Sequence, residues 1–137
     1  YDVSQLGWNY YMNEISAGIG LVQLKKLKKL NIIRKKIAKQ YSQKLIVKNK
    51  MEYNSNCSYH LYWIRVKNRN TFMKKMNDNG IETGIHYFPI HKMSFYKSKL
   101  KLPITEKITK EIVSIPIHPN LSDDEVSKII KLTNRFY

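Results

Sequence analysis

Two histidines and a tyrosine stand close together in the run from Gly80 to His91, directly after a short apolar stretch. Imidazole and phenol groups donate or accept hydrogen bonds, so His86, Tyr87 and His91 could bind phosphate or hydroxyl oxygens of a polar ligand. Nothing else in the sequence supplies a nucleophile arrangement, a glycine-rich phosphate loop or a carboxylate pair. We therefore expect this run to form one part of a larger site, and we assign no catalytic residue to the chain.

A metal site is the first alternative, because His60 and His118 add two further imidazoles. Their spacing does not match paired ligands one helical turn apart, and no cysteine or carboxylate cluster stands beside them. Cys57 is the sole cysteine, so a disulfide within the chain is impossible. We predict ordinary hydrogen-bonded histidines and no metal.

Composition limits the class of protein. The 137 residues, 42% of them hydrophobic, suffice for one modest domain with a core. The balance of 25 lysines and arginines against 10 acidic residues gives a net charge of +15, which favours anionic partners. Lysine, asparagine and isoleucine are all abundant, so biased codon usage explains the high positive charge equally well. Without a membrane-spanning run or a secretion signal, a cytoplasmic protein that does not enter a membrane is expected.

The segment 13–45 predicts one long helix or two helices in tandem, because apolar residues recur at spacings of three and four. Asn13 is expected to cap its start, and lysines crowd its later turns. Gly18 and Gly20 weaken a helix, so they indicate close packing against another backbone, which could belong to a second subunit. Residues 1–12 are interpreted as an extended lead-in, and residues 13–137 as the domain itself.

The remainder of the chain predicts alternating strands and helices. Gly80 is expected to end the first of these helices, Pro89 to end the following strand, and Ser122 with Glu125 to form a capping box for the last helix. The expected strands are 59–66, 81–87 and 113–117, and the expected helices are 71–79, 104–111 and the segment after Ser122. The predicted fold class is α+β, with a long N-terminal helix followed by a small three-stranded, mainly antiparallel sheet packed by helices.

The lysines of the long helix could also form a face that binds nucleic acid, since phosphate contacts supply much of such affinity. Aromatic residues should then line an exposed sheet in order, so that bases can stack on them. The segment 59–66 instead carries apolar residues on both faces, which predicts a strand covered on both sides. A solvated lysine face is therefore the preferred interpretation over a face that binds nucleic acid.

Four separated stretches carry motifs in a fixed order. They are G-W-N-Y-Y-M-N-E-I-S-A-G-I-G-L-V-Q-L-K-K-L at 7–27, Y-H-L-Y at 59–62, the run at 80–91, and S-I-P-I-H-P-N-L-S at 114–122. The first resembles the G-Y-N-Y-R-M-x-E-x-x-A-A-x-G-x-x-Q-L-x-x-L signature of the DegT/StrS-type nucleotide-sugar aminotransferases, and the others resemble later segments of that family. These are pyridoxal-phosphate enzymes of the aspartate-aminotransferase fold. The resemblance implies their C-terminal third, in which a connecting helix leads into the small domain of a fold-type I enzyme.

The implied reaction transfers an amino group, usually from glutamate, to a keto sugar carried on a nucleoside diphosphate. In the family, the lysine that forms the Schiff base, the acidic residue under the pyridine nitrogen and the stacked aromatic all precede this region. The resemblance therefore implies that pyridoxal phosphate is held mainly by a large domain that this chain lacks, and that this chain alone is inactive. The start at Tyr1 rather than methionine agrees with that expectation.

Some roles carry over residue by residue. Asn9 stands where the family's asparagine reaches across a homodimer to the cofactor phosphate of the other subunit. The arginine that follows in the pattern is Tyr11 here, so one expected charge contact is missing. His86, Tyr87 and His91 match an H-Y-x-P-x-H segment on the sugar-nucleotide side of the cleft, which implies hydrogen bonds to diphosphate or hydroxyl oxygens.

Two other functions remain open at the level of sequence. One is a stand-alone basic module that binds or interacts without catalysis, and the other is a nucleic-acid-binding domain. Residues encoded upstream of Tyr1 would separate the enzyme from the stand-alone module. Salt-dependent binding of single-stranded nucleic acid would favour the last possibility, because counterion release requires that dependence.

Overall fold

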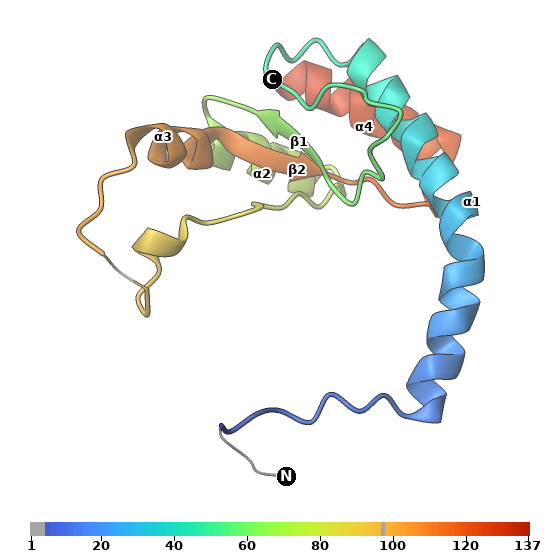
Figure 1. The fold of residues 1–137 in the computed structure, drawn as a ribbon. Coiled ribbons are helices and arrows are strands. Elements are labelled where there is room, and N and C mark those ends of the chain that lie inside the picture. Colours follow the sequence, from blue (N-terminus) through green and yellow to red (C-terminus); the bar gives the residue numbers. More distant parts are fainter. Residues whose placement is uncertain (1–4, 97) are drawn as a thin grey trace.

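The computed structural model describes residues 5–96 and 98–137 and confirms the predicted α+β class. A long helix precedes a small antiparallel sheet, and two further helices pack together behind that sheet (Figure 1). The elements in chain order are α1 (Glu14–Lys44), β1 (Tyr62–Arg65), α2 (Arg69–Asp78), the 3-10 turn η1 (Ile90–Lys92), α3 (Pro103–Glu111), β2 (Ile112–Ile115) and α4 (Asp123–Phe136).

Helix α1 is one continuous helix of 31 residues, so of the two predicted forms the single helix is observed. Asn13 caps it as expected, because its side-chain oxygen accepts the Ser16 N–H at 2.8 Å. At 1.5 Å per residue the helix is roughly 45 Å long, and only its C-terminal part packs on the body (Figure 1). The following apolar side chains of its first half are exposed: Ile15, Ile19, Leu21, Val22, Leu24 and Leu27.

The close packing predicted at Gly18 and Gly20 is not made within the described part of the chain. A Cβ added at either glycine would meet nothing within 4 Å. The first half of α1 therefore has open space on its glycine face. No helix of the described residues is long and apolar enough to cross a bilayer.

Tyr41 joins α1 to the sheet. Its side chain is fully buried, its hydroxyl donates to the Pro116 carbonyl at 2.7 Å, and its ring meets the Tyr62 ring edge-on at 5.2 Å. Burial raises the pKa of the Tyr41 hydroxyl well above its ordinary value, so the group stays a neutral donor. The end of α1 and the segment after β2 are thus held together through one hydrogen bond inside the core.

Strands β1 and β2 pair antiparallel, with Tyr62 opposite Ile115 and Ile64 opposite Val113. These four side chains lie on one face and are buried in the core. A single bridge extends the sheet on each side, from Lys50 to Ile64 and from Gly84 to Ser114. The order across the sheet is therefore the segment around residue 50, then β1, then β2, then the segment around residue 84.

The prediction of a third regular strand at 81–87 is wrong. Gly84 and Ser114 exchange both backbone hydrogen bonds, at 3.0 and 2.8 Å, but the pairing ends there. The neighbouring donors on β2 are not free to continue it. Pro116 has no N–H, and the Ile112 N–H already donates to a carbonyl in the last turn of α3.

The first strand also differs from its prediction, for a local reason. The first strand was predicted from Tyr59 but begins at Tyr62, because Tyr59 has a φ of 53° and so leaves the extended region. The expected cover on both faces of this strand holds only in part, since Trp63 and Arg65 are half-buried. Gly80 follows α2 with a φ of 74°, as predicted for a glycine that ends a helix.

Helix α4 agrees with its prediction. The Ser122 side chain accepts the Glu125 N–H and the Glu125 carboxylate accepts the Ser122 N–H, which completes the capping box. The predicted inward residues are all buried: Val126, Ile129, Ile130 and Thr133. This helix closes the core on the side occupied by α2 and the end of α1.

Candidate functional site

A hollow of about 540 Å³ lies at the Gly84 edge of the sheet. Its walls come from the residues just before β1, from the segment that leads away from Gly84, and from β2 with the residues that follow it. The chemistry-bearing side chains on these walls are His60, His86, Tyr87, Ser114 and His118. The volume lies within the range of small-molecule sites.

The absence of a side chain at Gly84 shapes one wall. A Cβ built there would lie 2.6 Å from Cε1 and 3.2 Å from Nδ1 of His86, so only glycine lets the imidazole rest against this backbone. Ser114 is the cross-strand partner of Gly84, and its side chain is 6% exposed. The imidazole and the serine hydroxyl are therefore placed at the same bridge of the sheet.

Two buried polar atoms at this bridge have no partner among the described residues. They are Nδ1 of His86 and Oγ of Ser114. Buried polar atoms are nearly always hydrogen-bonded, and each one left unpaired costs free energy. The two atoms are thus available to a group that enters the hollow.

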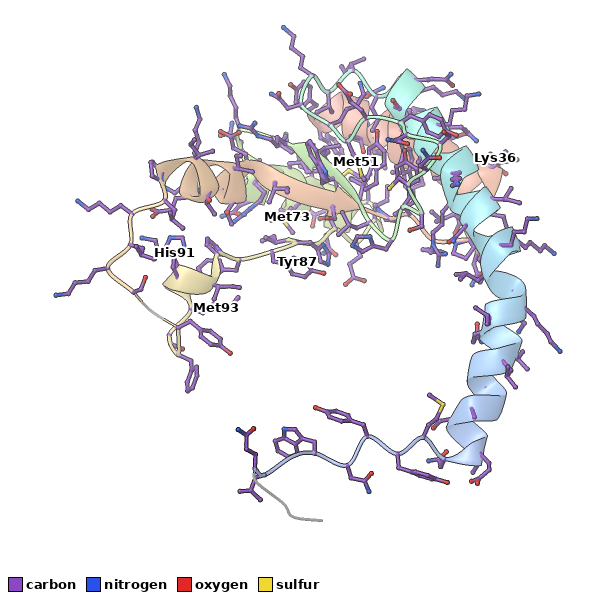
Figure 2. The ribbon with its side chains drawn as sticks, viewed as in Figure 1. Lys36, Met51, Met73, Tyr87, His91 and Met93 are labelled. Carbon is purple, nitrogen blue, oxygen red and sulfur yellow. The ribbon has the colours of Figure 1, made fainter. Side chains whose placement is uncertain are left out.

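His91 lies elsewhere. It sits in η1, is 8% exposed, and its Nε2 is 3.2 Å from Oε1 of Glu106 in α3. Figure 2 shows His91 on η1, apart from Tyr87. The hydrogen bond from His91, with help from the Leu102 N–H and Lys92, lowers the pKa of Glu106 to about 2. The structure therefore brings His86 and Tyr87 together and leaves His91 in a separate contact.

Asn9 lies in an exposed arm without regular secondary structure that precedes α1. Figure 1 shows this arm at the end of α1 that is remote from the sheet. The Asn9 Oδ1 accepts the Tyr11 backbone N–H at 2.9 Å, which fixes the amide so that its NH₂ group remains to donate outward. Asn9 is thus not part of the hollow of its own chain.

Sequence reasoning considered His60 and His118 only as metal ligands and did not single out Ser114. Among residues 5–96 and 98–137, no three or more histidine, cysteine or acidic side chains gather as a metal site. The available signal for Ser114 was a hydroxyl residue inside the apolar V-S-I-P-I run of a strand. Alternation along a strand does not tell whether such a hydroxyl has a partner.

The fold is that of a segment of solved aminotransferases. The aminotransferase TlmJ from Streptoalloteichus hindustanus superposes with a TM-score of 0.88 at 29% identity over 98% of this chain and 39% of its own. Spr1654 from Streptococcus pneumoniae, assigned as a sugar aminotransferase and solved in its PLP form, gives 0.85 at 27% identity over 99% and 38%. An uncharacterized Methanocaldococcus jannaschii protein, MJ1066, is 26% identical over 98% of this chain and 39% of its own.

A model of the DegT/DnrJ/EryC1/StrS aminotransferase family matches residues 1–133, so the chain belongs to this family. It spans about 39% of the length of the relatives it matches. The resemblance identified from the sequence motifs is thereby confirmed.

Pyridoxal phosphate fits this chain in one respect. The free NH₂ group of Asn9 is a donor suited to a phosphate oxygen. Covalent attachment needs a lysine, and no lysine is among the described residues that line the hollow. Asn9 thus offers a donor that fits a phosphate oxygen, and the described lining of the hollow offers no lysine for attachment.

Proposed function

We propose that this chain forms the C-terminal part of a pyridoxal-phosphate enzyme that transfers an amino group, usually from glutamate, to a nucleotide-linked keto sugar. The observation that carries the proposal is the family match over residues 1–133, which accounts for nearly the whole chain, while the chain covers only 39% of MJ1066 and of TlmJ. The cofactor supplies the electron sink of the reaction, and the protein supplies orientation and electrostatics. This chain alone is inactive, because the lysine for the cofactor lies outside it.

The arm supports a role in a homodimer. Residues 1–12 are proposed as the lead-in from the large domain, and the described residues of that arm expose Trp8, Tyr10 and Tyr11 at 84%, 86% and 80%. Aromatic side chains exposed to this degree favour a partner surface. With α1 roughly 45 Å long, Asn9 is held far from the hollow of its own chain, so its donor serves a phosphate bound by the other subunit.

His86 and Tyr87 are proposed to bind the substrate from the hollow, because both line it and Nδ1 of His86 lacks a partner. His91 is proposed to act less directly. Its contact with the Glu106 carboxylate attaches η1 to α3, and the segment that carries Tyr87 runs into η1. His91 thus positions the H-Y segment while its ring nitrogen remains engaged with the carboxylate.

The test compares this chain with the longer polypeptide that contains it. Each is incubated with pyridoxal phosphate, reduced with borohydride and weighed by mass spectrometry. We expect a pyridoxyl group on one lysine of the longer polypeptide and none on this chain. The longer polypeptide should also convert glutamate to 2-oxoglutarate in a single half-reaction.

A matched pair of variants in the longer polypeptide tests Asn9. Asn9→Ala should weaken cofactor binding by about tenfold, since a hydrogen bond to a charged group is lost. Asn70→Ala, at an exposed position of α2, should leave it unchanged. A pyridoxyl group on a lysine of this chain, or a longer polypeptide without the half-reaction, would refute the proposed function.

A further inference from the structure

The hollow beside β2 has an electrostatic character opposite to that of the chain as a whole. The chain has 25 lysines and arginines, yet none is among the described residues that line the hollow. The one charged side chain on its wall is the carboxylate of Glu82. A diphosphate is normally met by lysine, arginine or a metal, and a nearby carboxylate repels it. The hollow is therefore poorly suited to the diphosphate of a sugar nucleotide.

The remaining walls suit a neutral polar ring. His60, His86, Ser114 and Tyr87 offer donors and acceptors, while Leu61 and Pro116 offer apolar surface. Sugar hydroxyls both donate and accept, so they can pair with imidazole nitrogens in either tautomer and with a serine hydroxyl. The volume of about 540 Å³ leaves room for one such ring together with water.

The unpartnered atoms of the Gly84 bridge give the decisive observation. Ser114 is 94% buried, its Oγ has no partner among the described residues, and the same is true of the buried Nδ1 of His86. An apolar residue at position 114 would avoid the cost of the unpaired hydroxyl. A group that costs stability in the free chain is explained by a ligand that pairs with it.

We propose that this hollow binds the sugar ring of the substrate through its hydroxyls, with Ser114 and His86 as paired hydrogen-bonding residues and His60 at the rim. The diphosphate is bound outside the hollow. The inference rests on the proposed function for the kind of substrate, but it assigns to Ser114 and His60 a role in ligand binding and divides the substrate between two places.

The four histidines supply the test, because His60, His86 and His118 line the hollow and His91 does not. Their ring signals are followed by NMR in this chain while methyl α-D-glucopyranoside or inorganic pyrophosphate is added. We expect the glucoside to shift the three hollow histidines and leave His91 in place, and pyrophosphate to shift none of the three.

Ser114→Ala separates a ligand role from a structural one. It should weaken glucoside binding about fivefold to tenfold while the melting temperature stays the same or rises, since an unpaired buried hydroxyl is removed. Ser127→Ala, on the exposed side of α4, should leave glucoside binding unchanged and should not lower the melting temperature. A melting temperature that falls with binding unchanged would show a structural hydroxyl and overturn the inference.

The NMR shifts caused by the two added ligands also test the inference. Shifts with pyrophosphate alone would make the hollow an anion site and refute the inference, while the aminotransferase proposal would stand. The absence of shifts with both probes would refute it as well. Failure of the proposed function is detected separately, by cofactor attachment and the glutamate half-reaction, and the NMR titration depends on neither of these.

Discussion

Glu106 shows how one side chain can hold a loop through its charge. Its carboxylate meets Nε2 of His91 at 3.2 Å and Nζ of Lys92 at 3.3 Å, and it also accepts the Leu102 N–H. These contacts join η1 to the start of α3 and so fix the end of the segment that carries Tyr87 into the hollow. The lowered pKa of Glu106 is the electrostatic signature of this arrangement.

The pH dependence of stability follows from that pKa. Its value falls from 4.5 to about 2 on folding, so between these pH values the unfolded chain binds more protons at Glu106 than the folded chain does. The contribution is complete above pH 4.5 and is lost as pH falls towards 2. We expect the free energy of unfolding to decrease over this range in the native chain and to decrease less in Glu106→Gln.

Urea denaturation at a series of pH values measures this slope. Glu52→Gln, in an exposed loop, serves as the control and should keep the native slope. If the Glu106 variant and the native chain lost stability in parallel, the contacts of the Glu106 carboxylate would not contribute to folding.

At the scale of elements, hydrogen bonds made by side chains decide where helices begin and how they join the sheet. The capping box of Ser122 and Glu125 starts α4, and Tyr41 connects α1 to the carbonyl of Pro116. The first is a local motif that can be recognised along the sequence. The second joins residues 75 positions apart, so only the folded chain reveals it.

The N-terminal cap of α4 predicts a moderate loss of stability when it is removed. Ser122→Ala removes the acceptor of the Glu125 N–H and should lower the free energy of unfolding by about 1 kcal/mol. Equilibrium unfolding in urea measures the change. Ser127→Ala within the same helix is the control and should cause no loss, because alanine is the better helix former. Equal stability of the Ser122 variant and the native chain would rule out a contribution from the cap.

Loss of the Tyr41 hydroxyl should cost more, since it leaves the partly buried Pro116 carbonyl without its donor. Tyr41→Phe is expected to lower the free energy of unfolding by about 1–3 kcal/mol while the ring still packs against Tyr62. Tyr53→Phe, at a side chain that is 39% exposed, is the comparison and should have little effect. An unchanged unfolding midpoint for the Tyr41 variant would mean that the Pro116 carbonyl finds another donor.

At the scale of the whole molecule, a body of sheet and helices holds the end of α1 while the first half of that helix projects from it (Figure 1). Apolar residues repeat along the projecting half, yet Ile15, Ile19 and Leu24 are exposed at 77%, 60% and 66%. A helix with such a face is usually buried against something. The proposed homodimer supplies a second copy of this helix or of the body as the cover.

Self-association should therefore depend on this face. We expect analytical ultracentrifugation to show concentration-dependent association of the native chain and a monomer for the double variant Leu21→Glu with Leu24→Glu. Lys29→Glu, which alters charge without removing apolar surface, should still associate. At concentrations low enough for both chains to be monomeric, the double variant should unfold at the same urea concentration as the native chain, because the leucines are exposed in the monomer. A native chain that stays monomeric at every concentration would contradict this prediction.

Local interactions made much of this protein predictable from its sequence alone. The cap at Asn13, the glycine end at Gly80, the capping box at Ser122 and the inward face of α4 depend on neighbouring residues or on helical spacing, which are present in the sequence itself. The family resemblance also depended on the order of motifs along the chain, and the match over residues 1–133 confirmed it.

The tertiary structure decided the rest, because the deciding partners are distant in sequence. The strand expected around Gly84 reduces to one bridge, since Pro116 and the end of α3 leave β2 no free donors on either side of Ser114. His91 is removed from the hollow by Glu106, and Ser114 is brought into it by pairing with Gly84. A hydrogen-bond donor pairs with the acceptor that folding brings near it, and the spacing of residues along the sequence does not show which acceptor that is.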